Sequence, residues 1–147
     1  MAQTFSRLLV HVVFSTKDRT ASLKADIRTD LFAYMGGIIQ NFGGQSVLIN
    51  GVADHVHLLF SIPATMAMAE SMKIIKAKSS RWMRGRDRSF TWQPGYAAFS
   101  VSQSSVGQVT KYIASQQEHH KRVQFEDEFF SLLKKYEMVY DEQYVWA

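Results

Sequence analysis

The sequence predicts a single α+β domain in which helices pack against an antiparallel sheet. Its 147 residues suit one compact domain. Hydrophobic residues make up 46% and charged residues 20%, as in globular proteins. Along the chain the hydrophobic period alternates between two and about 3.6 residues, so strands and helices are interspersed. We therefore expect one domain over 1–147, with a core at about 5–120 and an accessory helix and tail at about 121–147.

Several classes of protein are excluded by composition. The longest apolar runs, such as Val56–Phe60, have the length of a strand and fall far short of a bilayer span. The first residues lack the basic, apolar and small-residue sections of a signal peptide. The chain has no cysteine, which rules out disulfides, thiolate metal sites and cysteine nucleophiles. We expect a cytoplasmic protein that makes no membrane contact.

The first half of the chain predicts the order strand, helix, strand, strand. Alternation over 5–15 predicts a strand, and apolar residues three and four apart over 21–42 predict a helix. Two further strands are expected at 47–50 and 52–62, joined by a tight hairpin at Gly51.

The second half adds a helix, a strand and two more helices. Thr65 is a candidate cap for a helix whose apolar stripe ends at Trp82, and a strand is expected over 90–102. A serine-capped helix to about residue 120 follows, and a short helix over 126–136 precedes an extended tail. The resulting order β-α-β-β-α-β matches the ferredoxin-like, or RRM-like, arrangement: an antiparallel sheet with helices on one face, here with extra C-terminal helices. This fold hosts many functions.

Basic residues are concentrated in one predicted helix. Seven of them lie between positions 73 and 88 against a single acid, Asp87. The net charge of +4 is modest, but a local positive patch is typical of proteins that bind a polyanion. A solvated helix face explains the charge equally well.

Two histidines stand out in the strand over 52–62. His55 and His57 are two residues apart, so their side chains share one face, while Val56, Leu58 and Phe60 point to the opposite, buried face. Two imidazoles at this spacing can hold one divalent cation, although the pair alone is weak evidence for a metal site.

The helix before residue 120 offers further candidate ligands. Tyr112 and Gln116 are four residues apart and project together, whereas Gln117 continues the apolar stripe. His119 and His120, about two turns beyond Tyr112, suit either metal ligation or phosphate contact. On spacing alone, Tyr112 is more simply a core tyrosine with a satisfied hydroxyl.

Taken together, these motifs resemble a known family. His55-Val56-His57 resembles the His–hydrophobe–His motif of the HUH endonuclease superfamily. With Tyr112-Ile113-x-x-Gln116 it is similar to the single-tyrosine transposases of the insertion-sequence-200 type and their repeat-associated relatives. The resemblance extends over nearly the whole chain, through the segments His11–Lys17, Lys76–Trp82, Trp92–Ser100 and Gln116–His120.

This resemblance implies a DNA transposase that cuts and rejoins single strands at the ends of a mobile element. His55, His57 and Gln116 would bind one Mg²⁺ or Mn²⁺, which polarises the scissile phosphate. Tyr112 would be the nucleophile and would form a 5′-phosphotyrosine bond, leaving a free 3′-hydroxyl. Because that bond conserves the energy of the phosphodiester, rejoining needs no nucleotide cofactor.

The resemblance also implies partners. The expected substrate is single-stranded DNA with a subterminal hairpin, and the expected assembly is a homodimer joined by sheet extension, in which the tyrosine helix can complete the partner's site. Trp82 and Trp92 could stack on bases, although core packing is the simpler role for each. The residues expected to follow the phosphates are Lys17, Arg19, Lys73, Lys76, Lys78, Arg81 and Arg84.

Two other classes of protein compete with this interpretation. A non-catalytic module of the same fold that binds single-stranded nucleic acid has no use for the combination of two histidines, Tyr112 and Gln116. Replication-initiator and relaxase-type nickases share the chemistry but are typically larger, with a different motif order. Tyr136, Tyr140 and Tyr144 compete for the nucleophile role, but none has a glutamine four residues later.

Overall fold

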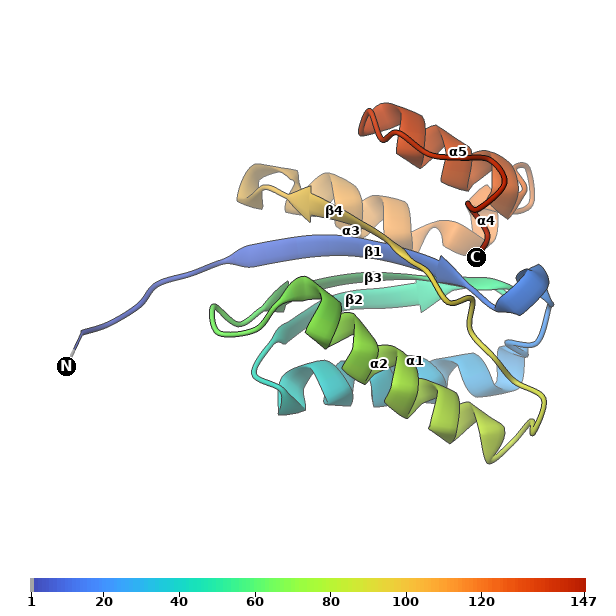
Figure 1. Cartoon of the computed structure of the whole chain (residues 1–147), viewed down its shortest axis with the longest axis horizontal. Helices are drawn as coiled ribbons and strands as arrows, with labels where there is room; N and C mark the ends of the chain where they lie inside the picture. Colours follow the sequence, from blue (N-terminus) through green and yellow to red (C-terminus); the bar gives the residue numbers. More distant parts are fainter. Residues whose placement is uncertain (1) are drawn as a thin grey trace.

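The computed structural model describes residues 2–147, and Figure 1 shows their arrangement. Four strands form the sheet: β1 (Leu8–Ser15), β2 (Gln45–Gly51), β3 (His55–Ile62) and β4 (Ala97–Val101). The helices are α1 (Ala25–Asn41), α2 (Met68–Arg84), α3 (Val106–Ala114), α4 (Gln116–His119) and α5 (Phe125–Lys135), with short 3₁₀ turns η1 (Lys17–Arg19) and η2 (Gln103–Ser105). No helix within residues 2–147 is long and apolar enough to cross a bilayer.

The sheet has the order β2-β3-β1-β4, and every neighbouring pair is antiparallel. β1 and β3 are therefore the central strands, and Val13 of β1 lies opposite His57 of β3. This order confirms the predicted ferredoxin-like arrangement. It places the histidine strand in the middle of the sheet, where its backbone is fixed by hydrogen bonds on both sides.

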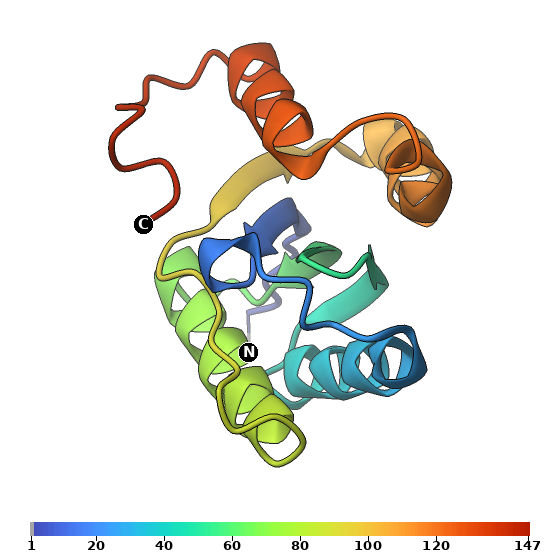
Figure 2. The ribbon, with the colours of Figure 1, turned by 90° about the vertical axis from the view of Figure 1, so that its right-hand side faces the viewer.

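Helices α1 and α2 cover one face of the sheet, as Figure 2 shows end-on. The main core lies between them and the side chains that β1 and β3 direct to that face, among them Phe14, Val56, Leu58 and Phe60. The predicted burial of this side of β3 is confirmed. Burial of this apolar surface is the main stabilising term for the sheet and helix layers.

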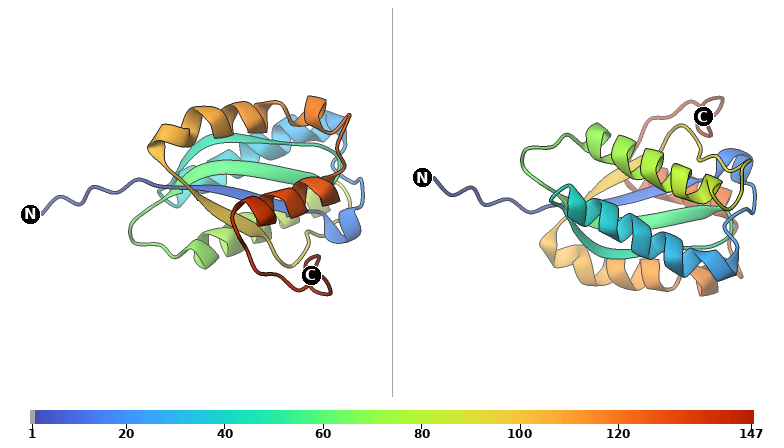
Figure 3. Two further views of the ribbon diagram at one scale, coloured as in Figure 1. Left: turned by 90° about the horizontal axis from the view of Figure 1, so that it is seen from above. Right: turned by 90° about the horizontal axis from the view of Figure 1, so that it is seen from below.

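The other face of the sheet is covered by α3, α4, α5 and the C-terminal segment (Figure 3). Phe125, Phe129 and Leu132 of α5 pack with Val13 and Phe99 of the sheet in a second buried cluster. Both faces of the sheet are thus buried, the second one beneath the predicted C-terminal helices. The amphipathic pattern of α5 predicted a helix but not the surface on which it docks.

Several element bounds differ from the sequence prediction. The predicted strand over 90–102 shortens to β4, because the carbonyls of residues 93–95 turn to accept hydrogen bonds from Lys76 Nζ at 2.6–2.9 Å instead of joining the sheet. Upstream of that turn, Trp92 makes only an isolated bridge to Thr16.

Helix starts and turns differ as well. The helix predicted from residue 21 begins at Ala25, and α2 begins at Met68 after Ala67 with no side-chain cap from Thr65. The β2–β3 connection spans residues 52–54 rather than a tight turn at Gly51. The helix predicted to run to residue 120 is interrupted at Ser115, which separates α3 from α4.

Candidate active site

The two β3 histidines lie side by side under α3–α5, with ring centroids 5.2 Å apart and no solvent exposure. Each has its Nδ1 engaged by another residue. His55 Nδ1 is 2.8 Å from Asp54 Oδ1, and His57 Nδ1 is 2.9 Å from His11 Nε2. These contacts direct both Nε2 atoms away from the sheet toward the same point, an arrangement typical of metal-ligating histidines.

The carboxylate of Glu128 occupies that point. Its Oε1 is 3.0 Å from His57 Nε2, 3.2 Å from His55 Nε2 and 3.1 Å from His120 Nε2. Glu128 lies on α5 and is buried, although acidic side chains are rarely buried without partners. Sequence reasoning missed it. The available signal was its place among Phe125, Phe129 and Leu132 on the apolar face of α5.

Tyr112 and Gln116 reach the same carboxylate from α3 and α4. The Tyr112 hydroxyl donates to Glu128 Oε2, and Gln116 Nε2 donates to the same atom at 3.2 Å. Gln116 Oε1 is 3.3 Å from His55 Nε2 and 2.9 Å from His120 Nε2. The structure therefore brings the predicted His55, His57, Tyr112 and Gln116 together within one chain.

The competing candidates for the glutamine ligand and for the tyrosine nucleophile lie outside this cluster. Gln117 hydrogen-bonds Asn50 and the Gly51 carbonyl on β2, so the break at Ser115 turns Gln116, not Gln117, inward. Tyr136 stacks on Phe99 with ring centroids 4.3 Å apart, and Tyr140 and Tyr144 are exposed.

All five histidines of the chain gather here. His55, His57, His120 and Glu128 each offer one ligand atom, and these four atoms lie within 4.8 Å of one another. His119 Nε2 is 3.1 Å from Glu128 Oε2 but is not aligned for a hydrogen bond, so this buried nitrogen has no hydrogen-bond partner among the described residues. A cluster of imidazoles and one carboxylate with an unsatisfied nitrogen suits a divalent cation.

Burial and the shared carboxylate set the electrostatics of the cluster. Burial lowers the pKa of His57 to about 4, so this ring is neutral at pH 7 and its Nε2 is available as a ligand. Burial also acts to lower the pKa of His55, but its hydrogen bonds to Asp54 and Glu128 outweigh it and the pKa rises.

The pKa values of Glu128 and Tyr112 are shifted in opposite directions. Burial opposes ionisation of Glu128, but hydrogen bonds from His120, His55 and His57 outweigh it and hold its pKa well below the ordinary value. Burial first, and then the neighbouring Glu128 carboxylate, raises the pKa of Tyr112. Tyr112 is therefore a phenol, not a phenolate, while Glu128 is ionised.

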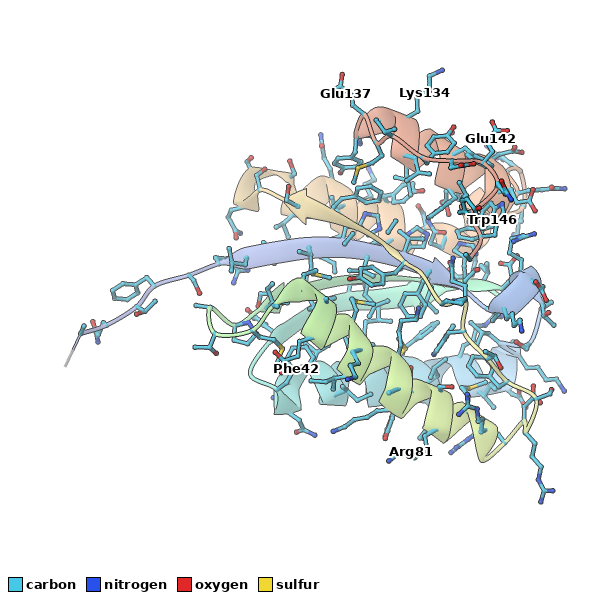
Figure 4. The ribbon with its side chains drawn as sticks, viewed as in Figure 1. Phe42, Arg81, Lys134, Glu137, Glu142 and Trp146 are labelled. Atoms are coloured by element: carbon cyan, nitrogen blue, oxygen red, sulfur yellow. The ribbon has the colours of Figure 1, made fainter. Side chains whose placement is uncertain are left out.

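Three of the predicted DNA-binding residues are engaged within the protein. Arg84 Nε donates to the Phe90 carbonyl at 3.3 Å. Lys76 donates to the three backbone carbonyls described above, and burial lowers its pKa to about 8. Arg19 pairs with Glu126 at 2.9 Å and stacks on Trp146, which is labelled in Figure 4. These contacts stabilise the 93–95 segment and α5.

The other predicted DNA-binding residues do not line the cavity beside Tyr112. Arg81, labelled in Figure 4, and the other basic residues of α2 lie on the opposite side of the sheet from α3–α5. Lys73, Lys78, Arg81 and Arg84 are exposed, as is Lys17 of η1. Trp92 is buried between Phe14 and Phe90, so its core-packing interpretation is confirmed.

Two cavities flank the cluster. One, of about 540 Å³, is lined by Asp54 and His120 together with Arg28 and Lys121. The other, of about 350 Å³, lies between α3 and α5 and is lined by Tyr112, His11 and Lys135 among others. The first cavity meets the cluster at His120 and the second meets it at Tyr112.

An antiparallel sheet carries two buried histidines and is faced by a helix with a tyrosine, which defines an α+β domain with a candidate metal and nucleophile site. The model of the family described as IS200-like transposases matches residues 4–116, and the chain belongs to this family. The match confirms the resemblance seen in the sequence. It ends before α5, so Glu128 lies outside the matched residues.

Individual proteins are also similar. ISDra2 transposase TnpA of Deinococcus radiodurans is 27% identical over 118 residues, which are 75% of this chain and 84% of that protein. The crystal structure of a D. radiodurans R1 protein assigned as a transposase has a TM-score of 0.64 and 23% identity, covering 79% of this chain and 95% of its own. A REP-associated tyrosine transposase bound to a REP hairpin also has a TM-score of 0.64, with 12% identity, covering 84% and 74%. At these identities the two structures show the shared fold alone.

Proposed function

We propose that this protein is a metal-dependent transposase that cleaves and rejoins single-stranded DNA through a 5′-phosphotyrosine intermediate. One observation carries the proposal: the Tyr112 hydroxyl, the Nε2 atoms of His55 and His57, and the Gln116 amide converge in one buried cluster. A domain that only binds nucleic acid gains nothing from burying these groups together, because each buried polar group costs desolvation energy.

The donor set supports a divalent cation at this position. His55, His57 and Gln116 were the expected ligands, and His120 and Glu128 lie close enough to contribute. Imidazole nitrogens with one carboxylate suit Mn²⁺ better than Mg²⁺, which prefers oxygen ligands. When bound, the ion would supply Lewis acidity at the scissile phosphate.

The chain's own residues supply the nucleophile and hold its proton. The Tyr112 oxygen forms the new bond to phosphorus while the bond to the 3′-oxygen breaks. The phenolic proton already points at Glu128 Oε2, which is the acceptor in place for it.

We further propose single-stranded DNA with a hairpin as the substrate, a homodimer as the assembly, and the cytoplasm as the location. The hairpin is supported by the shared fold with the REP-associated transposase that was solved with a REP hairpin. Lys17, Lys73, Lys78, Arg81 and Arg84 are the exposed basic residues that can follow phosphates. Because the α2 residues lie across the sheet from Tyr112, a bound strand has to pass an edge of the sheet to reach the site.

The test is cleavage of oligonucleotides taken from the genomic flanks of the coding sequence. We expect cutting with Mn²⁺, none with EDTA, and loss of cutting in His57→Ala with DNA binding retained. Gln117→Ala is the matched control, since Gln117 neighbours the site but bonds to β2. Metal-independent cutting, or cutting by His57→Ala at the wild-type rate, would contradict the proposal. Binding to hairpins without any cutting would favour the non-catalytic module.

A further inference from the structure

His11 contacts the ring nitrogen of His57 that does not face Glu128. It lies on β1 beside β3, is 2% exposed, and its Nε2 is 2.9 Å from His57 Nδ1 with the two rings stacked at 5.1 Å. His57 in turn directs its Nε2 to the cluster, 3.0 Å from Glu128 Oε1. The three side chains are therefore linked by two successive contacts, from His11 to His57 and from His57 to Glu128.

We infer that His11 is a positioning residue that holds the His57 ring, through the hydrogen bond between His11 Nε2 and His57 Nδ1, in the orientation that points His57 Nε2 into the cluster. This inference rests on the proposed metal site. A neutral imidazole has one N–H and one lone pair, so His11 can hold His57 Nδ1 as a donor or as an acceptor. Asp54 occupies the corresponding place behind His55, at 2.8 Å from its Nδ1.

The surroundings of His11 keep its ring in place. Its aromatic neighbours besides His57 are Phe99 and the Tyr112 ring, with centroids 6.2 and 6.1 Å away. It also lines the 350 Å³ cavity between α3 and α5. A change at His11 therefore acts on the side of the His57 ring that faces away from Glu128.

Three variants of the full chain separate this role from packing. His11→Gln keeps both a donor and an acceptor, His11→Leu keeps neither, and Phe99→Leu changes packing on the His11 ring without touching the hydrogen bond. Isothermal titration with Mn²⁺ should show His11→Leu weakened roughly 10- to 100-fold, with His11→Gln and Phe99→Leu close to wild type. Thermal unfolding of each variant checks that it is folded.

Imidazole ¹⁵N NMR gives a readout that a purely structural role would not move. After loading with diamagnetic Zn²⁺, we expect the His57 Nε2 signal to shift on coordination in wild type and in His11→Gln, and to shift less in His11→Leu at the same Zn²⁺ concentration. A folded His11→Leu that binds Mn²⁺ as tightly as wild type, or that shows the wild-type Nε2 shift, overturns the role of His11 alone. A wild-type protein that binds no metal overturns the metal site and this role with it.

Discussion

Glu128 lies at the centre of the candidate site, where its carboxylate contacts the other site residues. One carboxylate contacts His55, His57 and His120 and accepts from Tyr112 and Gln116. Burial, and after it this carboxylate, raises the pKa of Tyr112 and so opposes its use as a nucleophile. In the proposed mechanism, a divalent cation shared with the carboxylate would offset its charge and so would couple metal loading to activation of the tyrosine.

Glu128→Gln removes the charge and keeps the shape of the side chain. We expect its affinity for Mn²⁺ to fall by at least about 10-fold, because a carboxylate donor is replaced by a neutral amide. Isothermal titration measures this directly. Glu126→Gln is the matched control, since Glu126 lies on the same helix but pairs with Arg19. Equal loss of affinity in both variants would argue against a role for Glu128 at the metal.

At the scale of single residues, the sequence predicted those pairs of site residues that are close to each other in the chain. His55 with His57, and Tyr112 with Gln116, follow from strand and helix periods. Glu128 could not be found in this way, because it is 71 residues from His57 and only the docking of α5 brings them together. The charge of Lys76 was visible in the sequence, but its hydrogen bonds to carbonyls of residues 93–95 depend on tertiary structure.

Among the elements, α5 is the one that closes the site. It makes its packing contacts through Phe125, Phe129 and Leu132, and Trp146 packs against Phe125 and Phe129 with centroids 5.8 and 5.1 Å apart. Its helical pattern was visible in the sequence. Its docking surface was not, since several apolar strand faces could have received an amphipathic helix of this length.

Phe129→Ala tests whether α5 is held by this packing. We expect the free energy of unfolding to fall by about 3–5 kcal/mol, the usual cost of truncating a buried phenylalanine. Hydrogen exchange should show the loss of protection confined largely to α5, because β1 and β3 retain the separate core beneath α1 and α2. Equal loss of protection in β3 would show that the two layers unfold as one unit.

The whole molecule is a sheet between two helical layers, with the candidate DNA-contacting residues of α2 on one side and the tyrosine on the other. The fold class and strand order could be predicted because the alternation of strand and helix periods limits the possible topologies. The second helical layer, which buries the histidines, was not predictable from those periods.

Burial of the histidines makes the stability of the metal-free protein depend on pH. The pKa values of His57 and His11 are lowered to about 4 and about 3, so between pH 6.5 and 4 the unfolded chain binds protons that the native protein does not. Stability is therefore lost as the pH falls through this window. The raised pKa of His55 affects stability only above pH 6.5, so it does not alter the loss of stability between pH 6.5 and 4.

Thermal unfolding in EDTA at pH 7, 6, 5 and 4 measures this dependence. We expect the midpoint to fall steadily over that range, and to fall less steeply in His11→Leu, which removes one of the two groups. A midpoint that is constant or rises from pH 6.5 to 4 would contradict the burial of neutral histidines.

The most direct test of the central claim is covalent trapping of the DNA on Tyr112. Wild-type protein, Tyr112→Phe and the control Tyr136→Phe would be incubated with labelled single strands from the genomic flanks, with Mn²⁺ or with EDTA, and run on denaturing gels. We predict a protein–DNA band that requires metal and survives in Tyr136→Phe but disappears in Tyr112→Phe. A band that persists in Tyr112→Phe, or that forms in EDTA, would contradict the assignment of Tyr112 as a metal-dependent nucleophile.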